Sequence, residues 1–535
     1  MRTSYPARDD APCDEAEPSK PGVRAYRGQL KRIVARDPAT VVFELCAGDA
    51  AFLGKVASPN LVIDDTAWLE SRIATSGEEQ PISRAPNGTG PFRLDAWNRG
   101  ELILSRFDGY HGSAARPGTL VFRWDADPRR RVEALVDGSV DGIDGLDEPG
   151  FTAVAGNPEL VTHLREGLNI VYLGMNDRYA PYDKAAVRQA IARGLDRQAL
   201  FEAGFSTDAT LATHLTPCVV PYGCAGGSWW DSDALAAKDQ LAEAGFPVGF
   251  ATKIQYSDEP RDYLPDPVGL ATELQRQLVE DLGIEAELEP LPFDELVARA
   301  DRGELDGIHL LGARGRYPDP TAFLDPRLGA GTPPEFGAVD QSIRDALARG
   351  AATADKVARS KAYAAANGRI RSLAPLVPLA HVGSIAAVRA DVDGFHVSPT
   401  ATEWFAAVSP GDRKQFVWMQ ASEPPGLYCA DETSPDALRV CAQVLEGLYG
   451  FTGPDATPVP VLAKSCTPND SLDVWTCKLR ADVRFHDGSL LDANDVVLSY
   501  AVQWDAAHPR HRGRNGTFQG FVDRFGPLLN LPAGS

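Results

Sequence analysis

The segment from Val483 to Trp504, VRFHDGSLLDANDVVLSYAVQW, constrains the fold of this chain more than any other stretch. It predicts the end of a strand, a turn at Asp487-Gly488, and then a helix. The Asp492 carboxylate can accept hydrogen bonds from the free N–H groups of the first helical turn, and Asp495 places negative charge where the helix dipole favours it. Apolar side chains then recur at helical spacing, at Val496, Tyr500 and Trp504. The segment therefore predicts a strand–turn–helix unit that packs one helical face on a core.

Length and charge narrow the class of protein. A chain of 535 residues is long enough for two to four domains, and 44% hydrophobic with 24% charged residues is ordinary for a globular protein. The formal net charge of −21 argues against a nucleic acid or an anionic membrane surface as partner, because both would repel the protein. No apolar run approaches the roughly 20 residues that a membrane-spanning helix needs.

The eight cysteines give information about the cellular compartment in which the protein folds. An even number that falls into close sequence pairs favours disulfides over reduced core thiols, and hence an oxidising environment. The expected pairs are Cys13–Cys46, Cys218–Cys224, Cys429–Cys441 and Cys466–Cys477. Zinc binding is disfavoured, because the sequence has no Cys-x-x-Cys and no histidine pair near these cysteines. The start, MRTSYPARDD, lacks the apolar centre of a signal peptide, so the chain is interpreted as cytosolic or as a mature form, and the cysteines favour the mature form.

Between these landmarks, strand and helix patterns alternate, which predicts an α/β fold. Expected strands cover residues 40–46, 170–175, 284–288 and 308–311, and residues 376–380 are expected to be a buried apolar stretch. Expected helices cover residues 184–203, 269–282, 293–300, 341–348 and 356–371, the first capped by Asp183 and the second ended by Gly283.

Several segments together resemble one known family. The stretch from Val483 resembles the V-x-F-H-D-G-x-x-L-x-A-x-D-V signature of bacterial extracellular solute-binding proteins of family 5, the oligopeptide/dipeptide/nickel class. Asn87–Phe92 (NGTGPF), the helix from Pro181 (PYDKAAVRQA) and the stretch from Tyr317 (YPDP) resemble three further motifs of that family. In family members the first signature lies in the first quarter of the chain, whereas here it lies near the end. We therefore expect a circular permutation, with the family's original ends joined near residue 414.

The resemblance implies the type II periplasmic-binding-protein-like fold, with two lobes and three subdomains that close on a ligand. The expected organisation is a flexible lead-in over residues 1–25, a small subdomain of residues 26–90 with 443–535, a lobe I core and hinge of residues 91–168 with 385–442, and lobe II of residues 169–384.

The same resemblance implies where ligand binds. One group is the loop after the family's first strand, with Tyr428, Asp431, Glu432 and Thr433. A second is the loop with Arg314, Arg316, Tyr317 and Asp319, although Asp319 could instead cap a short helix at Pro320. A third group is aromatic, Trp97 and Trp404, for which core or rim packing is the alternative.

One position departs from the family pattern. In peptide-binding relatives, the residue before Tyr317 resembles the aspartate that captures a peptide's α-amino group, and here it is Arg316. A guanidinium repels an ammonium and pairs with carboxylate or phosphate. We therefore expect a ligand with an anionic or neutral end at this loop, unless Arg316 only pairs with a neighbouring acid.

The function implied by the resemblance is capture of a small or peptide-like solute outside the cytoplasm and delivery to the permease of an ABC importer. The protein would be a monomer in the periplasm or at the cell envelope, peripheral to the membrane, with no cofactor, no metal and no catalytic residue. The alternatives are a ligand-sensing component of a receptor and a hydrolase on the same fold. No Gly-x-Ser-x-Gly supports the hydrolase.

Other motifs favour structural roles. Asn87–Phe92 lacks the Lys-Ser/Thr and the helix of a phosphate loop. His486-Asp487 could be a base with its orienting acid, but a turn is the preferred interpretation. His508 and His511 could bind nickel, although their spacing within a polar loop argues against it.

Overall fold

A computed structural model of the chain describes residues 4–5, 11–13, 21–73, 83–513 and 516–533. The chain divides into two compact units, one made of Met1–Arg165 with Ile385–Ser535 and the other of Glu166–Ser384. Much of the predicted lead-in over residues 1–25 lies outside the described residues. Its described part is attached to the first unit, because Ser4–Tyr5 pairs with a strand there and Cys13 is bonded to Cys46.

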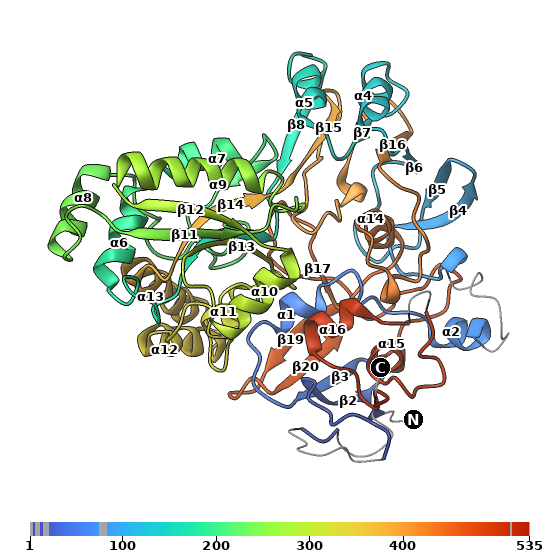
Figure 1. Cartoon of the computed structure of the whole chain (residues 1–535). Coiled ribbons are helices and arrows are strands. Elements are labelled where there is room, and N and C mark those ends of the chain that lie inside the picture. The colour runs from blue at the N-terminus through green and yellow to red at the C-terminus, as the bar shows by residue number, and fades with distance from the viewer. Residues whose placement is uncertain (1–3, 6–10, 14–20, 74–82, 514–515, 534–535) are drawn as a thin grey trace. The chain divides into compact units, whose positions relative to one another are not determined.

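The first unit contains a five-stranded sheet to which both ends of the chain contribute (Figure 1). In sheet order its strands are β1 (Ser4–Tyr5), β2 (Leu30–Asp37), β3 (Thr40–Leu45), β20 (Val474–Leu479) and β19 (Ala463–Pro468). β20 pairs antiparallel with β3, from Val474 opposite Glu44 to Lys478 opposite Thr40. Residues more than 400 positions apart in sequence are therefore neighbours in one sheet.

The helix predicted after Asp492 is confirmed as α15 (Ala493–Trp504). The Asp492 carboxylate accepts a hydrogen bond from the Asn494 N–H, and Asp495 accepts one from the Asp492 N–H, which completes a capping box. The buried face of α15 carries Tyr500, which packs edge-on against Phe43 with ring centroids 5.1 Å apart. The helix of this sequence motif thus packs against the core of the five-stranded sheet.

A second sheet of the first unit has seven strands, in the order β4, β5, β6, β16, β7, β15, β8. Their bounds are Phe92–Asn98, Glu101–Arg106, Thr119–Trp124, Gln415–Gln420, Gly142–Ile143, Ser384–Arg389 and Leu160–Arg165. β16 runs parallel to both β6 and β7, so a late segment of the chain lies at the centre of a sheet built from early ones. A two-stranded ribbon, β17 (Tyr449–Gly450) with β18 (Val459–Pro460), completes the strands of the described part of this unit.

The other helices of the first unit whose bounds lie within the described residues are shorter than α15. They are α1 (Phe52–Val56), α2 (Thr66–Ile73), α4 (Pro128–Val136), α5 (Glu148–Ala155), α14 (Pro435–Val444) and α16 (Gln519–Phe525).

The Asn87–Phe92 turn makes a close backbone approach to the end of α14. The Gly90 N–H donates to the Val444 carbonyl oxygen at 3.0 Å, and a Cβ atom at Gly88 would collide with that same oxygen. The glycines are therefore needed for packing against α14, which agrees with the prediction that this turn is no phosphate loop.

The second unit is a six-stranded mixed sheet with helices around it (Figure 1). Its strand order is β10 (Ala209–Leu211), β14 (Leu376–Val382), β9 (Asn169–Met175), β13 (Ile308–Arg314), β11 (Ala251–Tyr256) and β12 (Glu285–Pro290). Its helices are α6 (Ala185–Gly194), α7 (Arg197–Gly204), α8 (Ala234–Glu243), α9 (Pro267–Arg276) continued by a π turn (Gln277–Asp281), α10 (Phe293–Arg302), α11 (Asp325–Leu328), α12 (Gln341–Ala351) and α13 (Lys356–Leu373).

The single helix predicted over residues 184–203 is wrong. The structure has two helices, α6 and α7, because the Asp196 carboxylate accepts hydrogen bonds from the N–H groups of Gln198 and Ala199 and starts a new helix. Asp183 is not the cap of α6 either, since Lys184 occupies that position and no side chain caps the helix. Gly283 has a φ of +72° and lies just after the π turn that continues α9, so it ends this helical segment as predicted.

All four predicted disulfides are present, Cys13–Cys46, Cys218–Cys224, Cys429–Cys441 and Cys466–Cys477.

Candidate ligand-binding site

The first predicted binding loop follows β16 in the first unit. It contains a short 3₁₀ helix (Cys429–Asp431), which the Cys429–Cys441 disulfide ties to α14. Asp431 and Glu432 are buried, and Thr433 is exposed. The Asp431 carboxylate accepts hydrogen bonds from the N–H groups of Gly516 and Phe518 at 2.9 and 3.1 Å, so it also holds a neighbouring segment in place. Of the predicted residues in this loop, Asp431 thus has a structural role as well.

Tyr428 begins this loop and lies among acidic groups. Its ring packs edge-on against Phe518, with centroids 6.2 Å apart, and only 5% of the residue is exposed. Burial raises the pKa of Tyr428 well above its ordinary value, and the carboxylates of Asp64 and Asp431 raise it further. The hydroxyl is therefore a neutral group that can donate one hydrogen bond and accept others.

Asp64, which the sequence analysis did not single out, is one of the two acids whose charge raises the pKa of Tyr428. It is 4% exposed. Burial raises its pKa from 3.8 to about 7, with a smaller contribution from the neighbouring Asp65 carboxylate. The sequence offers one signal for it, an acidic pair directly after the apolar run of residues 61–63.

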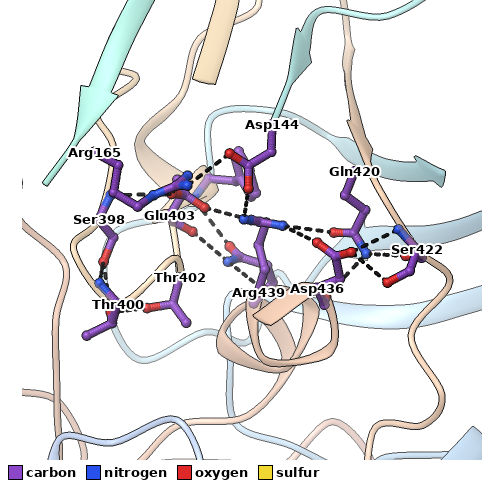
Figure 2. Close-up of polar contacts among 12 residues, drawn as sticks. Asp144, Arg165, Ser398, Thr400, Thr402, Glu403, Gln420, Ser422, Asp436 and Arg439 are labelled. Atoms are coloured by element: carbon purple, nitrogen blue, oxygen red, sulfur yellow. Dashed lines mark hydrogen bonds and ion pairs between the residues drawn. The ribbon is translucent and has the colours of Figure 1, made fainter. Parts of the chain in front are cut away.

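A buried ionic network in the first unit involves α14, the helix that the Cys429–Cys441 disulfide ties to this loop (Figure 2). The guanidinium of Arg439, on α14, donates to Glu403 Oε2 at 2.7 Å, to Asp436 Oδ1 at 2.8 Å and to Asp144. Arg165, at the end of β8, donates to Glu403 Oε1 and to Asp144 Oδ1 at 2.9 Å. The two arginines share Glu403 and Asp144, so α14 is tied to the end of β8.

The two arginines of this network lower the pKa values of the carboxylates that they contact. Burial alone would raise the pKa of Asp144, but the Arg165 and Arg439 guanidiniums outweigh it and hold the pKa at about 2. The pKa of the fully buried Glu403 is lowered by the same two guanidiniums, against burial and against Asp144. Both carboxylates are therefore ionised at neutral pH.

The second predicted loop follows β13 in the second unit. Arg314 is exposed and forms an ion pair with Asp262, and its guanidinium lies 6.0 Å from the centroid of the Tyr263 ring. Arg316 is also exposed, and within the described ranges it makes no hydrogen bond and no ion pair. The alternative that Arg316 pairs with a neighbouring acid therefore finds no support among the described residues.

Asp319, in the same loop, is buried and engaged. Its carboxylate accepts hydrogen bonds from the N–H and the hydroxyl of Thr321 at 3.1 and 2.8 Å and forms an ion pair of 2.9 Å with Arg359. It thus caps the 3₁₀ helix Pro320–Ala322, as the alternative interpretation predicted. Tyr317 is half-buried, and its hydroxyl oxygen lies at hydrogen-bonding distance, 3.2 Å, from Thr321 Oγ1.

The two predicted aromatic residues lie in the first unit and contact protein. The half-buried Trp97, on β4, donates from Nε1 to Glu423 at 2.9 Å, and the Arg84 guanidinium lies 3.7 Å from its ring centroid. Trp404 is half-buried and packs against the core of the seven-stranded sheet. These contacts fit rim and core packing, and a ligand role for either tryptophan stays a prediction.

Comparison with known proteins identifies the family. The family described as "Bacterial extracellular solute-binding proteins, family 5 Middle" matches residues 13–333 and 457–520. The chain belongs to this family.

Curated relatives and a solved structure agree with that assignment. The chain is 27% identical over 385 residues to heme-binding protein A of Haemophilus influenzae. This alignment covers 71% of this chain and 70% of the relative. It is 25% identical over 393 residues to the dipeptide-binding protein of Escherichia coli, with 72% of each chain covered. The structure of HbpA2 from Haemophilus parasuis matches with a TM-score of 0.65 and 26% identity, over 71% of this chain and 75% of that chain. This solute-binding protein therefore has the mixed α/β fold of the type II periplasmic binding proteins.

The histidines of this solute-binding protein that were considered for chemistry have structural contacts. His486 Nε2 lies 3.0 Å from the Gly90 carbonyl oxygen, and Asp487 accepts a hydrogen bond from the Ser489 N–H, as a turn requires. His511 Nδ1 lies 2.6 Å from the Val502 carbonyl oxygen. Hydrogen bonds to the main chain thus account for His486 and His511.

One group of metal-type side chains occurs within the described part of the solute-binding protein, His214 with Cys218 and Cys224. The two sulfurs are joined in a disulfide, so they are no thiolate ligands. No helix among the described residues is long and apolar enough to cross a membrane.

Proposed function

We propose that this protein captures a small solute outside the cytoplasm and delivers it to the permease of an ABC importer. Membership of the family supports this role, and so do relatives named for binding heme, dipeptides and glutathione. The protein binds and releases its solute without chemical change, and it acts as a monomer at the cell envelope. Ligand contacts only have to exceed the free energy needed to shift the conformational equilibrium.

The observation that bears most on the ligand is the state of Arg316. Its side chain is exposed and makes no hydrogen bond or ion pair with the described residues, so it remains available to a solute. Asp319, three residues on, is buried and already paired with Arg359, so it offers no replacement for an amine-binding aspartate. We infer that this loop receives a carboxylate, a phosphate or a neutral group of the solute.

Calorimetry with di- to pentapeptides tests this proposal, with N-acetylated peptides, glutathione and heme alongside. We expect acetylation to leave peptide affinity at this loop unchanged, and the charge reversal Arg316→Asp to weaken binding of acidic solutes at least tenfold. Lys361→Asp is the matched control, because Lys361 is an exposed residue of α13 outside the loop and the charge change is the same. Equal losses in both variants, or tight peptide binding that Arg316→Asp leaves unchanged, would contradict the role of Arg316.

The transport role is tested by identifying the membrane protein that binds this solute-binding protein. Co-purification of the protein with an ABC permease supports delivery to an importer, whereas co-purification with a membrane receptor alone supports a sensing role. Turnover of a peptide or ester library would favour a hydrolase.

We further propose that the chain is a circular permutant with the subdomains predicted above. The antiparallel pairing of β20 with β3 and the position of β16 between β6 and β7 support this, because early and late segments complete the same sheets. A relinked chain that begins near residue 414 and joins the present end to residue 26 should fold with the same circular dichroism spectrum. Failure of that chain to fold, with several linkers, would contradict the permutation.

A further inference from the structure

A histidine lies beside the disulfide that closes the short loop Cys218–Cys224 in the second unit. One ring nitrogen of His214 and the sulfurs of Cys218 and Cys224 all lie within 4.8 Å of one another. The Thr213 hydroxyl oxygen is close to all three groups, at 3.1 Å from His214 Nδ1 and at 3.8 and 3.9 Å from the two sulfurs. An imidazole and two sulfurs are thus gathered in one place.

His214 is held in position by the structure around it. The residue is 6% exposed. The preceding main chain is bonded on both sides, because the Ala212 N–H donates to the Leu379 carbonyl oxygen at 3.0 Å and the Trp229 N–H donates to the Thr213 carbonyl oxygen at 3.1 Å. The imidazole therefore does not depend on the disulfide for its place beside the two sulfurs.

The loop also has contacts that hold its shape without the Sγ–Sγ bond. The side-chain amide of Asn367, on α13, donates to the carbonyl oxygens of Ala225 and Gly223 at 2.9 and 3.4 Å. A Cβ atom at Gly223 would lie 2.2 Å from the Pro217 carbonyl oxygen, so the two ends of the loop are in close main-chain contact. Val220, at the middle of the loop, is 1% exposed. Two free cysteines would consequently stay near each other after reduction.

This disulfide is more accessible to a reductant than the others. Cys218 is exposed and Cys224 is half-buried, whereas the other disulfides have no exposed cysteine. Both Cys429–Cys441 and Cys466–Cys477 are formed by buried residues, and Cys13–Cys46 by half-buried ones. Exposed disulfides are the ones most readily reduced, because the attacking group must reach a sulfur atom.

We propose that reduction of the Cys218–Cys224 disulfide creates a zinc site formed by Cys218, Cys224 and His214. A dithiol reductant breaks the Sγ–Sγ bond, becomes a disulfide itself, and leaves its two protons on the cysteine thiols. Binding of Zn²⁺ to the two sulfurs and the imidazole then releases these two protons, because zinc binds cysteine as the thiolate.

The ligand set determines which cation fits. Two thiolates and one imidazole are typical zinc ligands, and three protein ligands leave the fourth tetrahedral position open to water. The two thiolate charges neutralise Zn²⁺. Calcium and magnesium prefer oxygen ligands, which this set does not supply. The loop would then be closed by a covalent bond when oxidised and by a metal ion when reduced, and neither state requires a transported solute or a permease.

The first experiment tests whether this disulfide is reduced before the others. The whole protein is treated with low concentrations of tris(2-carboxyethyl)phosphine, since a dithiol would itself chelate zinc. Free thiols are alkylated with iodoacetamide and located by peptide mass spectrometry. We expect Cys218 and Cys224 to be labelled at a phosphine concentration that leaves the other three disulfides intact. Labelling of a buried pair first would overturn the proposal.

The second experiment measures zinc binding at that degree of reduction. After removal of reductant and metal under nitrogen, the protein competes with a chromophoric indicator for Zn²⁺ at pH 7.5. We expect one Zn²⁺ per chain, with an affinity at least a hundredfold above that of the oxidised protein. Cobalt(II), used as a spectroscopic substitute, should show a thiolate-to-metal charge-transfer band only in the reduced protein.

Substitutions separate the proposed site from adventitious binding to thiols. His214→Ala should weaken zinc binding at least tenfold. The matched control is His163→Ala, a half-buried histidine of β8 in the first unit, which should leave zinc affinity unchanged. Cys218→Ser changes an exposed side chain and should also lose the high-affinity site, so it decides the matter if His214→Ala does not fold. Equal zinc affinity in the oxidised and reduced proteins, or unchanged affinity in either His214→Ala or Cys218→Ser, would overturn the site.

Discussion

Replacement of Arg439 by methionine should destabilise the first unit by about 3–5 kcal/mol, because it leaves buried carboxylates without their cation. The substitution keeps an unbranched side chain of moderate length and removes only the guanidinium. Glu403 and Asp144 would then share Arg165 alone, and Asp436 would keep only its hydrogen bonds from Ser422.

The structure sets the size of this effect. The pKa of Asp144 is held at about 2, against an ordinary 3.8, so the ionised carboxylate is favoured by roughly 2 kcal/mol even after the opposing cost of burial. Glu403 is fully buried and adds a contribution of similar kind through Arg439 Nε. The remaining Arg165 limits the loss, which is why the expected value stays below 5 kcal/mol.

Urea unfolding followed by circular dichroism at pH 7 measures this loss, since urea does not screen charges. Arg116→Met is the matched control in the same unit, because Arg116 pairs at the surface with Asp393, whose side chain is 81% exposed. That pair should be worth less than about 1 kcal/mol. A loss in Arg439→Met within 1 kcal/mol of the control would refute the reasoning. Glu403→Gln added to Arg439→Met should recover part of the loss, because it removes one unpaired charge.

The pH dependence of folding stability follows from the same pKa shifts. Because the folded-state pKa values of Asp144 and Glu403 lie below their ordinary values, their contribution to stability is complete above the ordinary pKa, near 4. It is lost as the pH falls from about 4 toward 2. Wild-type stability should therefore fall more steeply over this interval than that of Arg439→Met, and parallel curves would contradict the network's electrostatic role.

Three further predictions concern single sites. Asp64→Asn should stabilise the protein by up to roughly 4 kcal/mol above pH 7 and by little below pH 4. The reason is that burial raises the pKa of Asp64 to about 7, so ionisation of this carboxylate opposes folding. Urea unfolding at both pH values checks this. Replacing Cys429 and Cys441 by alanine should cost about 3 kcal/mol for a sequence separation of 12, measured against the disulfide-bonded protein; no change would contradict the loop-closure argument. Asp492→Ala should cost about 1 kcal/mol through loss of the helix cap, and an unchanged urea midpoint would contradict that role.

Features that depend on neighbours in the chain were predictable. The cap and span of α15 follow from Asp492, Asp495 and the helical spacing of apolar residues, all within one segment. The four disulfides join cysteines 6 to 33 positions apart, a range in which sequence proximity is informative. The division of residues 184–203 into two helices was missed because the apolar spacing continues across Asp196, while the local cap at Asp196 prevails.

The ligand loops were predicted only by resemblance, and their local roles were not. Nothing near Asp319 in sequence indicates Arg359, which lies 40 positions away and pairs with it. The availability of Arg316 could be stated only once the surrounding acids had been placed.

The sequence by itself determined the α/β class, the capped helix, the disulfides and the family, because short-range spacing and turn chemistry act within a few residues. Only the tertiary structure decided that Arg439 would share Glu403 with Arg165, at separations of 36 and 238 residues, and that Asp64 would be buried, which raises the pKa of its carboxyl group. The physical reason is that the energy of a charge depends on burial and on what faces it. Both are set by segments far apart in the chain.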